Sequence, residues 1–164
     1  MIREVEALHT ALIGLGSNLG DRRGRLQGAL RLLVERDCRV VRVSALRETE
    51  AWGFESRNRF LNGAAMIETE LEPVGLLEVL EETERALGRE HKSAGGHYED
   101  RAVDLDILLY DDLVMNTRRL TIPHPRMCER RFVLEPLCEI APQWVHPVAQ
   151  ASVAELLARL ASEE

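Results

Sequence analysis

The chain is poor in cysteine and in aromatic residues, and it contains no long apolar run. Its three cysteines, Cys38, Cys128 and Cys138, are odd in number and match neither zinc-ligand nor thioredoxin spacing. This argues for a reduced chain in which the thiols serve packing. No apolar stretch approaches the length of a transmembrane helix, and the first residues lack the basic-then-apolar pattern of a signal peptide. We therefore expect a cytoplasmic protein.

The chain also lacks an excess of positive charge. Its formal net charge of -7 argues against broad affinity for nucleic acids or anionic membranes, so an anionic substrate would need a local cluster of cations. The 164 residues suffice for a full core without disulfides or metals, and the sequence shows no repeat, low-complexity segment or linker. These observations predict a single domain over residues 1–164.

Apolar residues alternate between strand-like and helix-like spacing along the chain. Strands are predicted over residues 10–15, 39–44, 60–69 and 101–110, and helices over about 21–35 and from Pro73 to a glycine cap at Gly88. The order β-α-β-β-α-β predicts an α+β, ferredoxin-like core, in which an antiparallel sheet carries both helices on one face. A proline-containing C-terminal extension follows, closed by a short helix over residues 153–160.

The last predicted strand carries Asp104 and Asp106 among aliphatic residues. Because side chains alternate between faces along a strand, the two carboxylates share one face about 7 Å apart and repel each other unless a cation lies over them. Mg²⁺ is usually held by one or two carboxylates together with substrate phosphates. The pattern therefore fits a magnesium site, and equally an amphipathic edge strand with a solvated acidic face.

A cation-rich stretch precedes these aspartates. It contains a Ser-Ala-Gly-Gly centre and the basic residues Arg89, His91, Lys92, His97 and Arg101. Beside an acidic metal site, such cations suit a nucleoside triphosphate, and a loop of this kind can close as a lid. A solvated surface loop is the alternative interpretation.

Four further residues are candidates for binding. Phe60 and Asn62 share a strand face, where a ring could stack on a flat heterocycle while the amide reads its edge, although a lone Phe is often a core residue. Glu84 lies beside the apolar stripe of its helix, so either an arginine or a functional group should face it. His124, held between two prolines near arginines, could donate to phosphate or be structural.

Two glycines, Gly14 and Gly16, lie around the end of the first strand. They match neither the dinucleotide-binding nor the Gly-Lys-Ser/Thr phosphate template. We expect residues 16–20 to form a tight turn that brings the backbone close to a ligand or a neighbouring strand.

Taken together, these motifs resemble the 6-hydroxymethyl-7,8-dihydropterin pyrophosphokinase family, over roughly residues 11 to 147. The matching blocks are collinear, and they are Gly16-Ser-Asn18, Glu48-Thr-Glu50, Phe60-Leu-Asn62, Glu84 with Gly88-Arg89, Arg101-x-x-Asp-Leu-Asp-Ile-Leu108, Leu120-Thr-Ile-Pro-His124 and Arg130-Arg-Phe132. The resemblance implies transfer of the terminal diphosphate of ATP to a pterin hydroxymethyl group, with release of AMP, in folate biosynthesis.

The same resemblance implies residue roles. Asp104 and Asp106 would ligate two Mg²⁺ ions that bridge the ATP phosphates, and Phe60 and Phe132 would sandwich the pterin. Asn62 and the backbone near Thr49 and Trp52 would contact the edge of the pterin. Arg89 and Arg101 would bind phosphates. The other implied nucleotide contacts are His124, Arg130, Glu81 and Ile107. Glu84 would help to order mobile loops.

The chain departs from the family pattern in two regions. Arg47 replaces a frequent tyrosine and Ala51 a proline before the third predicted strand. In the cation-rich stretch, Tyr98-Glu-Asp100 replaces a Trp-Gly-Pro-like block, and His91 and His97 occupy positions often held by arginine. Weaker ATP binding and a shifted substrate are both compatible with these changes. The metal-binding aspartates are retained.

Two rival functions use the same residues differently. A two-metal nucleotide hydrolase would use water as the acceptor, and a non-catalytic ferredoxin-like ligand sensor would keep the acidic face only for solvation. The partners expected under the first interpretation are ATP and a pterin, and the expected oligomeric state is a monomer.

Overall fold

Five strands of the computed structural model form its central sheet, in the order β2-β4-β1-β5, with β3 paired to β4. The structure describes residues 7–49, 59–88 and 102–162. The strands are β1 (His9–Ser17), β2 (Cys38–Val43), β3 (Arg47–Thr49), β4 (Phe60–Thr69) and β5 (Asp104–Tyr110). The four pairings among them are antiparallel. This order confirms the ferredoxin-like antiparallel core predicted from the sequence.

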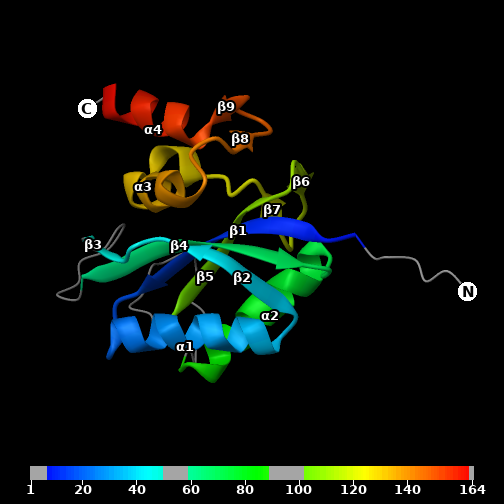
Figure 1. Cartoon of the computed structure of the whole chain (residues 1–164), viewed down its shortest axis with the longest axis vertical. Helices are drawn as coiled ribbons and strands as arrows, with labels where there is room; N and C mark the ends of the chain where they lie inside the picture. The colour runs from blue at the N-terminus through cyan, green and yellow to red at the C-terminus, as the bar shows by residue number, and fades with distance from the viewer. Residues whose placement is uncertain (1–6, 50–58, 89–101, 163–164) are drawn as a thin grey trace, which may run out of the picture.

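Helices α1 (Arg22–Glu35) and α2 (Pro73–Ala86) cover one face of the sheet (Figure 1). The Asp21 side chain caps α1 by accepting a hydrogen bond from the Gly24 amide at 3.1 Å. Proline opens α2, and Gly88 follows its end with a φ of 105°, as the predicted glycine cap requires. Fully buried side chains from both helices and the sheet form the core on this face, among them Ile13, Leu33 and Leu80.

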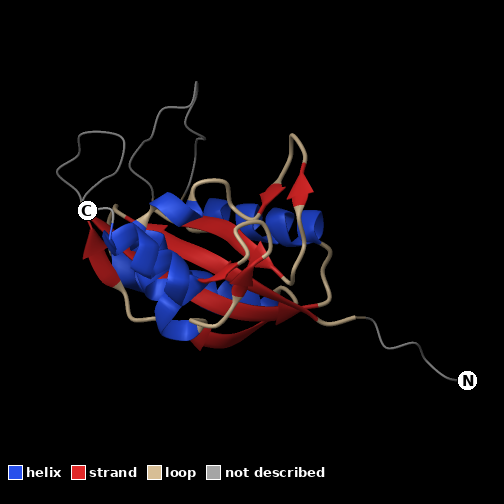
Figure 2. Cartoon of the chain, turned by 90° about the horizontal axis from the view of Figure 1, so that it is seen from above, coloured by secondary structure: helices blue, strands red, loops and turns tan. Residues whose placement is uncertain are grey.

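The C-terminal extension covers part of the opposite face (Figure 2). It consists of the ribbon β6 (Met115–Asn116) and β7 (Thr121–Ile122), the turn η2 (Met127–Glu129), α3 (Arg131–Ile140), the ribbon β8 (Val145–His146) and β9 (Ala151–Ser152), and α4 (Val153–Ser162). The closing helix confirms the prediction for residues 153–160.

Helix α3 was not predicted, because Pro136 interrupts the local helical signal. Proline removes a backbone donor and clashes with the preceding turn. Here α3 nevertheless forms, because it packs against β4 and α4 and buries Leu134 and Leu137 completely. Tertiary burial therefore outweighs the local penalty.

Two predicted boundaries were also wrong. The first strand does not end before Gly16 but runs to Ser17, since both residues pair with β4. Residues 47–49, where no strand was predicted, form the short strand β3, which pairs with the start of β4. Both errors arise where cross-strand pairing, rather than local residue preference, determines the backbone conformation.

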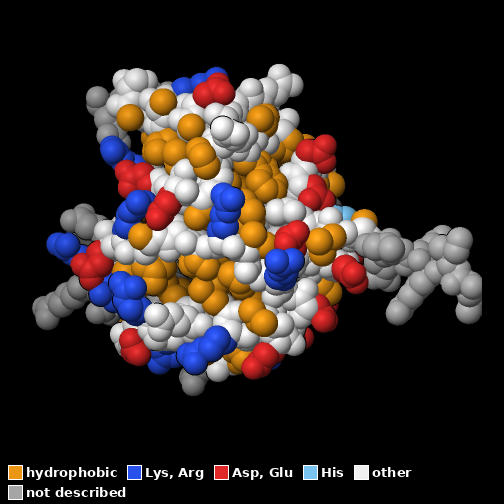
Figure 3. Space-filling view, in the orientation of Figure 1, with side chains coloured by type: hydrophobic (Ala, Val, Ile, Leu, Met, Phe, Trp, Pro, Cys, Tyr) orange, Lys and Arg blue, Asp and Glu red, His pale blue; other side chains and the backbone are white. Residues whose placement is uncertain are grey.

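Side chains on the face away from α1 and α2 divide into two groups. We call Leu12, Ala64, Leu108 and Leu109 the apolar patch; they pack against α3 and α4 in a second core. Figure 3 shows apolar side chains in two bands, one level with α3 and α4 and one between the sheet and α1, with acidic and basic side chains interspersed. None of the described helices is both long and apolar enough to span a membrane.

Candidate active site on the open part of the sheet

The second group, which we call the polar patch, comprises Phe60, Asn62, Asp104 and Asp106 around Gly16. In the register of the sheet, Gly16 lies between Asn62 on β4 and Asp104 on β5. A Cβ placed on Gly16 would lie 3.1 Å from Asn62 Oδ1, 3.8 Å from Phe60 Cδ1 and 3.9 Å from the Asp104 Cβ. The missing side chain therefore allows residues from both neighbouring strands to converge. The predicted close approach of the backbone at this glycine is confirmed, but it occurs within a strand and not in a turn.

Gly14 continues this surface by one step along β1. It pairs with Asp106 on one side and with Ala64 on the other, so the aspartates face two glycines on the neighbouring strand. Sequence reasoning missed this flat strip. The available signal was the alternation of Gly14 and Gly16 with buried Ile13 and Leu15, which marks one strand face without side chains.

The amide of Asn62 is held by a neighbour. Its Nδ2 donates a hydrogen bond to Thr49 Oγ1 on the adjacent strand β3. Asn62 is 9% exposed, whereas Phe60 beside it on the same face is half-buried. An aromatic ring next to an oriented amide can contact both the plane and the edge of a flat heterocycle. The predicted shared face of Phe60 and Asn62 is thus confirmed, and Thr49 lies next to Asn62.

Asp104 and Asp106 are half-buried and alternate with buried Leu105 and Ile107, so they share the face of the polar patch. In the described part of the chain, no group of three or more His, Cys, Asp or Glu side chains is placed to hold a metal. Two hard oxygen donors beside an open glycine surface match a Mg²⁺ ion whose other ligands come from phosphates and water. The residues present therefore fit the expected metal.

Glu84 in α2 is hydrogen-bonded to the backbone of β5, the strand that carries both aspartates. Its side chain is 5% exposed, and its Oε2 accepts a hydrogen bond of 2.9 Å from the Leu105 amide, between the two aspartates. One partner of the Glu84 carboxylate is thus the strand backbone; an arginine or a functional group facing Glu84, as the sequence suggested, stays a prediction. Such a bond on the edge strand β5 fixes its backbone where the carboxylates leave it.

His124 lies beside β5, because its amide donates to the Leu108 carbonyl at 2.9 Å. Burial lowers the pKa of His124 to about 4; the charge of Arg130 adds to this lowering and that of Asp104 opposes it. Its Nδ1 accepts from the Arg126 amide at 3.2 Å, which leaves Nε2 to carry the proton of the neutral ring. The imidazole is therefore a neutral donor near an aspartate and an arginine.

Phe132 lies in the first turn of α3, the helix that packs on the strand of Phe60. The Arg130 guanidinium carbon lies 5.7 Å from the centre of the Phe132 ring, at cation–π distance. The Arg130 guanidinium thus lies near an aromatic ring, and its charge adds to burial in lowering the pKa of His124. The extension thereby adds an aromatic ring and two basic residues to the sheet.

Two of the residues implied in nucleotide binding have other surroundings for their side chains. The side chain of Ile107 is 3% exposed in the core beneath α1 and α2, so it is not on the face of the aspartates. Glu81 forms an ion pair with Arg119, at 2.5 Å between Oε1 and Nη2. Trp52, Arg89 and Arg101 lie outside the described residues, as do His91, Lys92, His97 and the departures at Ala51 and Tyr98-Glu-Asp100.

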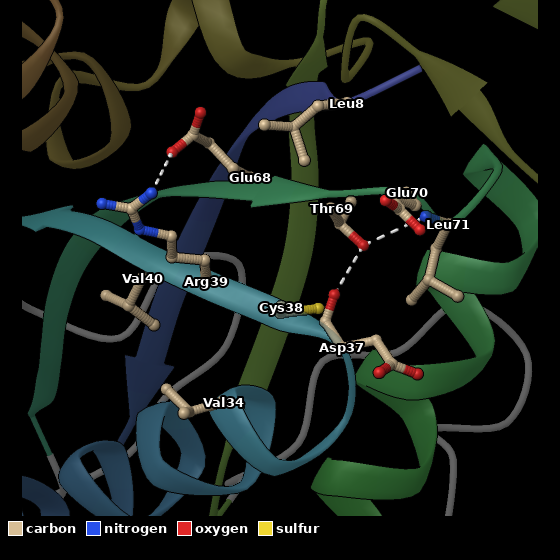
Figure 4. A pocket seen from close by; sticks show the side chains of 10 residues that line it. All are labelled: Leu8, Val34, Asp37, Cys38, Arg39, Val40, Glu68, Thr69, Glu70 and Leu71. Carbon is tan, nitrogen blue, oxygen red and sulfur yellow. Dashed lines mark hydrogen bonds and ion pairs between the residues drawn. The ribbon is translucent and has the colours of Figure 1, made fainter. Parts of the chain in front are cut away.

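A pocket of about 750 Å³ lies at the other end of the sheet (Figure 4). Its lining residues come from the start of β2 and the end of β4, among them Cys38, Arg39, Glu68 and Thr69. Thr69 is seven residues along β4 from Asn62, or about 24 Å of strand. This pocket contains none of the residues of the polar patch.

The fold and the polar patch define a class: ferredoxin-like α+β proteins in which one sheet face combines an acidic pair with an aromatic ring and an amide. Within that class, the model of the 7,8-dihydro-6-hydroxymethylpterin-pyrophosphokinase (HPPK) family matches residues 12–142. The chain belongs to this family, as the resemblance of its motifs predicted.

Curated relatives agree with this assignment. A 2-amino-4-hydroxy-6-hydroxymethyldihydropteridine pyrophosphokinase of Porphyromonas gingivalis is 46% identical over 138 residues, which cover 84% of this chain and 93% of the relative. The Bacillus subtilis protein of the same name is 45% identical over 134 residues, with 81% of this chain and 78% of the relative covered. The folic acid synthesis protein fol1 of Schizosaccharomyces pombe is 40% identical over 93% of this chain, which spans only 21% of that protein.

Solved structures support the fold. The wild-type HPPK-DHPS of Plasmodium falciparum, crystallised with SDX-DHP, superposes with a TM-score of 0.77 at 14% identity. The match covers 98% of this chain and 46% of that one, so this chain spans less than half of the larger protein. At this identity the comparison concerns the fold alone, and it confirms the α+β architecture.

Proposed function

We propose that this chain transfers the terminal diphosphate of ATP to the hydroxymethyl group of 6-hydroxymethyl-7,8-dihydropterin and releases AMP, in folate biosynthesis. The observation that supports this best is the convergence of Asn62, Phe60 and Asp104 over Gly16. It sets a site for a flat heterocycle directly beside an acidic pair. The family membership is consistent with this pairing of a pterin and a nucleotide.

The reaction needs alignment more than a covalent nucleophile. The hydroxymethyl oxygen of the pterin attacks the β-phosphorus of ATP, the bond from that phosphorus to the α–β bridging oxygen breaks, and the hydroxyl proton is released. Phosphoryl-type transfer gains most from positioning and from neutralisation of charge on the phosphates. In this scheme the two reactants would bind side by side on the polar patch, which would supply the positioning.

Each group of residues has a part in this scheme. Asp104 and Asp106 would hold two Mg²⁺ ions, which supply charge neutralisation at the phosphates. Phe60 and Phe132 stack on the pterin, while Asn62 and the segment around Thr49 and Trp52 read its edge. Arg89, Arg101, Arg130 and His124 bind the nucleotide, and the buried Glu84 keeps the aspartate strand in place. A role for Ile107 would fall to its backbone, because its side chain is in the core.

We further propose that residues 1–164 act as one domain, that the protein is a monomer and that it works in the cytoplasm. The continuous sheet supports the first point, because it pairs strands from residues 9 to 110. The three cysteines are free thiols, and their spacing matches no zinc or thioredoxin motif. Both observations are in keeping with a reducing compartment.

A product assay separates this function from its rivals. With ATP, Mg²⁺ and the hydroxymethylpterin, we expect AMP and diphosphorylated pterin in equal amounts. Free pyrophosphate or phosphate with unmodified pterin would instead identify a hydrolase. Titration with Mg²⁺ and a non-hydrolysable ATP analogue tests the sensor alternative, which gives no reason for metal-dependent nucleotide binding.

The assignment of Phe132 has its own test. Its replacement by alanine should weaken pterin binding more than ATP binding, since stacking area is lost on one side of a flat ring. Equal losses for both ligands in a fluorescence titration would show that Phe132 acts only as a core residue.

A further inference from the structure

Arg22, in the first turn of α1, connects two parts of the chain that are distant in sequence. Its Nη2 pairs with Glu48 Oε1 at 2.5 Å, and its Nη1 donates to the Arg59 carbonyl at 2.9 Å. Glu48 immediately precedes Thr49, and Arg59 immediately precedes Phe60. The two residues that Arg22 contacts therefore flank segment 50–58 and adjoin two residues of the proposed pterin site.

The local backbone places Arg22 for this contact. Gly20 has a φ of 67°, and its carbonyl accepts a hydrogen bond of 3.0 Å from the Arg22 amide, which closes the turn before the helix. Asp21 then caps α1. Arg22 and Glu48 line a cavity of about 390 Å³ together with Leu46 and Leu61, so the ion pair bridges the gap between the start of α1 and β3.

The electrostatics point the same way. The hydrogen bond from Arg22, followed by its charge and that of Arg59, lowers the pKa of Glu48. Because Glu48 is solvent-exposed, this pair contributes little to global stability. The ion pair matters instead because it holds the backbone next to Thr49 and Phe60. A displacement of about 1 Å in a substrate-positioning group can lower the rate about a hundredfold.

We propose that Arg22 is a positioning residue for the pterin side of the site: by joining Glu48 to Arg59 it fixes Thr49 and Phe60 relative to each other. This inference rests on the proposed function for the identity of the ligand. The contact itself is independent of that identity. Arg22 touches neither substrate in this scheme and acts through its two neighbours.

The chain offers a matched control on the same helix. Arg36 at the end of α1 pairs with Glu82 at 2.6 Å, with side-chain exposures of 32% and 53%, against 29% and 50% for Arg22 and Glu48. Both pairs are exposed arginine–glutamate bridges, but the Arg36 pair joins α1 to α2 and contacts no residue of the polar patch. Any general effect of losing such a bridge would appear in both.

The test compares Arg22→Gln, Glu48→Gln, the double variant and Arg36→Gln. Pterin affinity is measured by fluorescence titration with Mg²⁺ and an ATP analogue, and the affinity of the analogue alone by calorimetry. We expect Arg22→Gln to weaken pterin binding roughly ten- to a hundredfold while binding of the analogue changes little. Glu48→Gln should have a smaller effect, because the bond to the Arg59 carbonyl remains. The double variant should resemble Arg22→Gln, and Arg36→Gln should resemble the parent.

Amide hydrogen exchange without ligands separates this inference from the proposed function. Exchange in peptides covering residues 47–49 and 59–62 should rise in Arg22→Gln and not in Arg36→Gln. If the parent fails to bind pterin and this difference persists, the contact stands and the proposed substrate is wrong. If the parent transfers diphosphate but Arg22→Gln matches it in both affinity and exchange, the positioning role is overturned. Equal losses in Arg22→Gln and Arg36→Gln would overturn it as well.

Discussion

The apolar patch and the polar patch share strands β1, β4 and β5 and the same face of the sheet, yet they differ in every property that matters for function. Leu12, Ala64 and Leu108 are buried beneath α3 and α4. A few residues away on the same strands, Gly16, Asn62 and Asp104 form one row across the sheet. The pairing of β1 with β4 continues unbroken from one patch to the other, whereas the pairing of β1 with β5 shifts register between Leu12 and Ile13. The two patches also differ in their side chains and in what covers them.

This comparison shows how the C-terminal extension defines the site. Helix α3 packs on β4 and closes the apolar patch, while its first turn carries Phe132. The segment before it adds Arg130 and the neutral ring of His124, whose pKa is lowered by burial and by the charge of Arg130 and raised by that of Asp104. One segment therefore completes the second core and also delivers binding residues to the polar patch. Changes in the two patches should accordingly separate stability from chemistry.

The largest effect is expected for Asp104→Ala and Asp106→Ala in the polar patch. Losing one carboxylate loses metal ligation worth several kcal/mol in the transition state, so the rate of diphosphate transfer should fall about a thousandfold or more. The thermal midpoint should stay close to that of the parent, because the change also relieves repulsion between the acids. The measurement is initial rate at saturating Mg²⁺, with the exposed Asp112→Ala as control. Near-normal rates in either aspartate variant would refute the metal assignment.

A change in the apolar patch should show the reverse pattern. Leu137 in α3 is fully buried in the second core, so Leu137→Ala should lower the free energy of unfolding by about 2–5 kcal/mol. The KM values for ATP and pterin should stay near those of the parent, because Leu137 lies outside the polar patch. Urea unfolding and steady-state kinetics measure the two effects. A raised pterin KM without loss of stability would show that the two patches are not separable.

Much of the fold was predictable because its core elements are locally consistent. Strands β4 and β5 show period-two alternation, and α2 combines an apolar stripe with a proline start and a glycine end. Helix α3 was not predictable, since Pro136 argues against a helix and only its packing on β4 compensates. The extent of β1 through Gly16 and Ser17 likewise depends on a partner strand that no local pattern reveals.

The site divides in the same way. The aspartate pair and the shared face of Phe60 and Asn62 follow from strand periodicity, which the structure confirms. The hydrogen bond between Glu84 and the Leu105 amide could not be predicted, because that amide is a backbone group presented by tertiary packing. Nor could the two contacts of Arg22, whose partners lie 26 and 37 residues away in sequence.

A smaller effect should separate the two glycines that border the patches. At Gly16 a methyl group would lie 3.1 Å from Asn62 Oδ1, whereas at Gly14 the nearest atom is a Leu108 methyl at 3.4 Å. We expect Gly16→Ala to displace the amide and weaken pterin binding roughly tenfold. Gly14→Ala makes only ordinary contacts and should leave pterin affinity unchanged, with equal or greater stability. Pterin titrations of both variants decide the point, and equal affinities would show that Asn62 does not read the ligand at this position.

The smallest effect concerns two histidines of the C-terminal extension. His124 adjoins the polar patch, and His146 in β8 is 6% exposed and bonded through Nδ1 to the Val148 and Ala149 amides. Burial lowers the pKa of both, that of His124 to about 4. Between about pH 4 and the unfolded value near 6.5, the unfolded chain binds a proton at residue 124 that the folded chain does not. Stability should therefore fall as pH drops through this range, and His124→Gln should reduce that dependence.

Nucleotide binding should then distinguish the two rings. A triphosphate beside His124 favours the imidazolium, so an ATP analogue with Mg²⁺ should raise the pKa of His124, by roughly 1 to 3 if the phosphates come within about 6 Å. The pKa of His146 should not change, because that ring is 6% exposed in the β8–β9 ribbon and bonded to the Val148 and Ala149 amides. NMR titration of the imidazole resonances with and without the analogue measures both in one sample. If the pKa of His124 stays at its ligand-free value while the analogue is bound, this residue does not face the phosphates, and among the described cations Arg130 would be left to contact them. A parallel rise at His146 would instead indicate a change of the whole extension, and the separation of the two patches would fail.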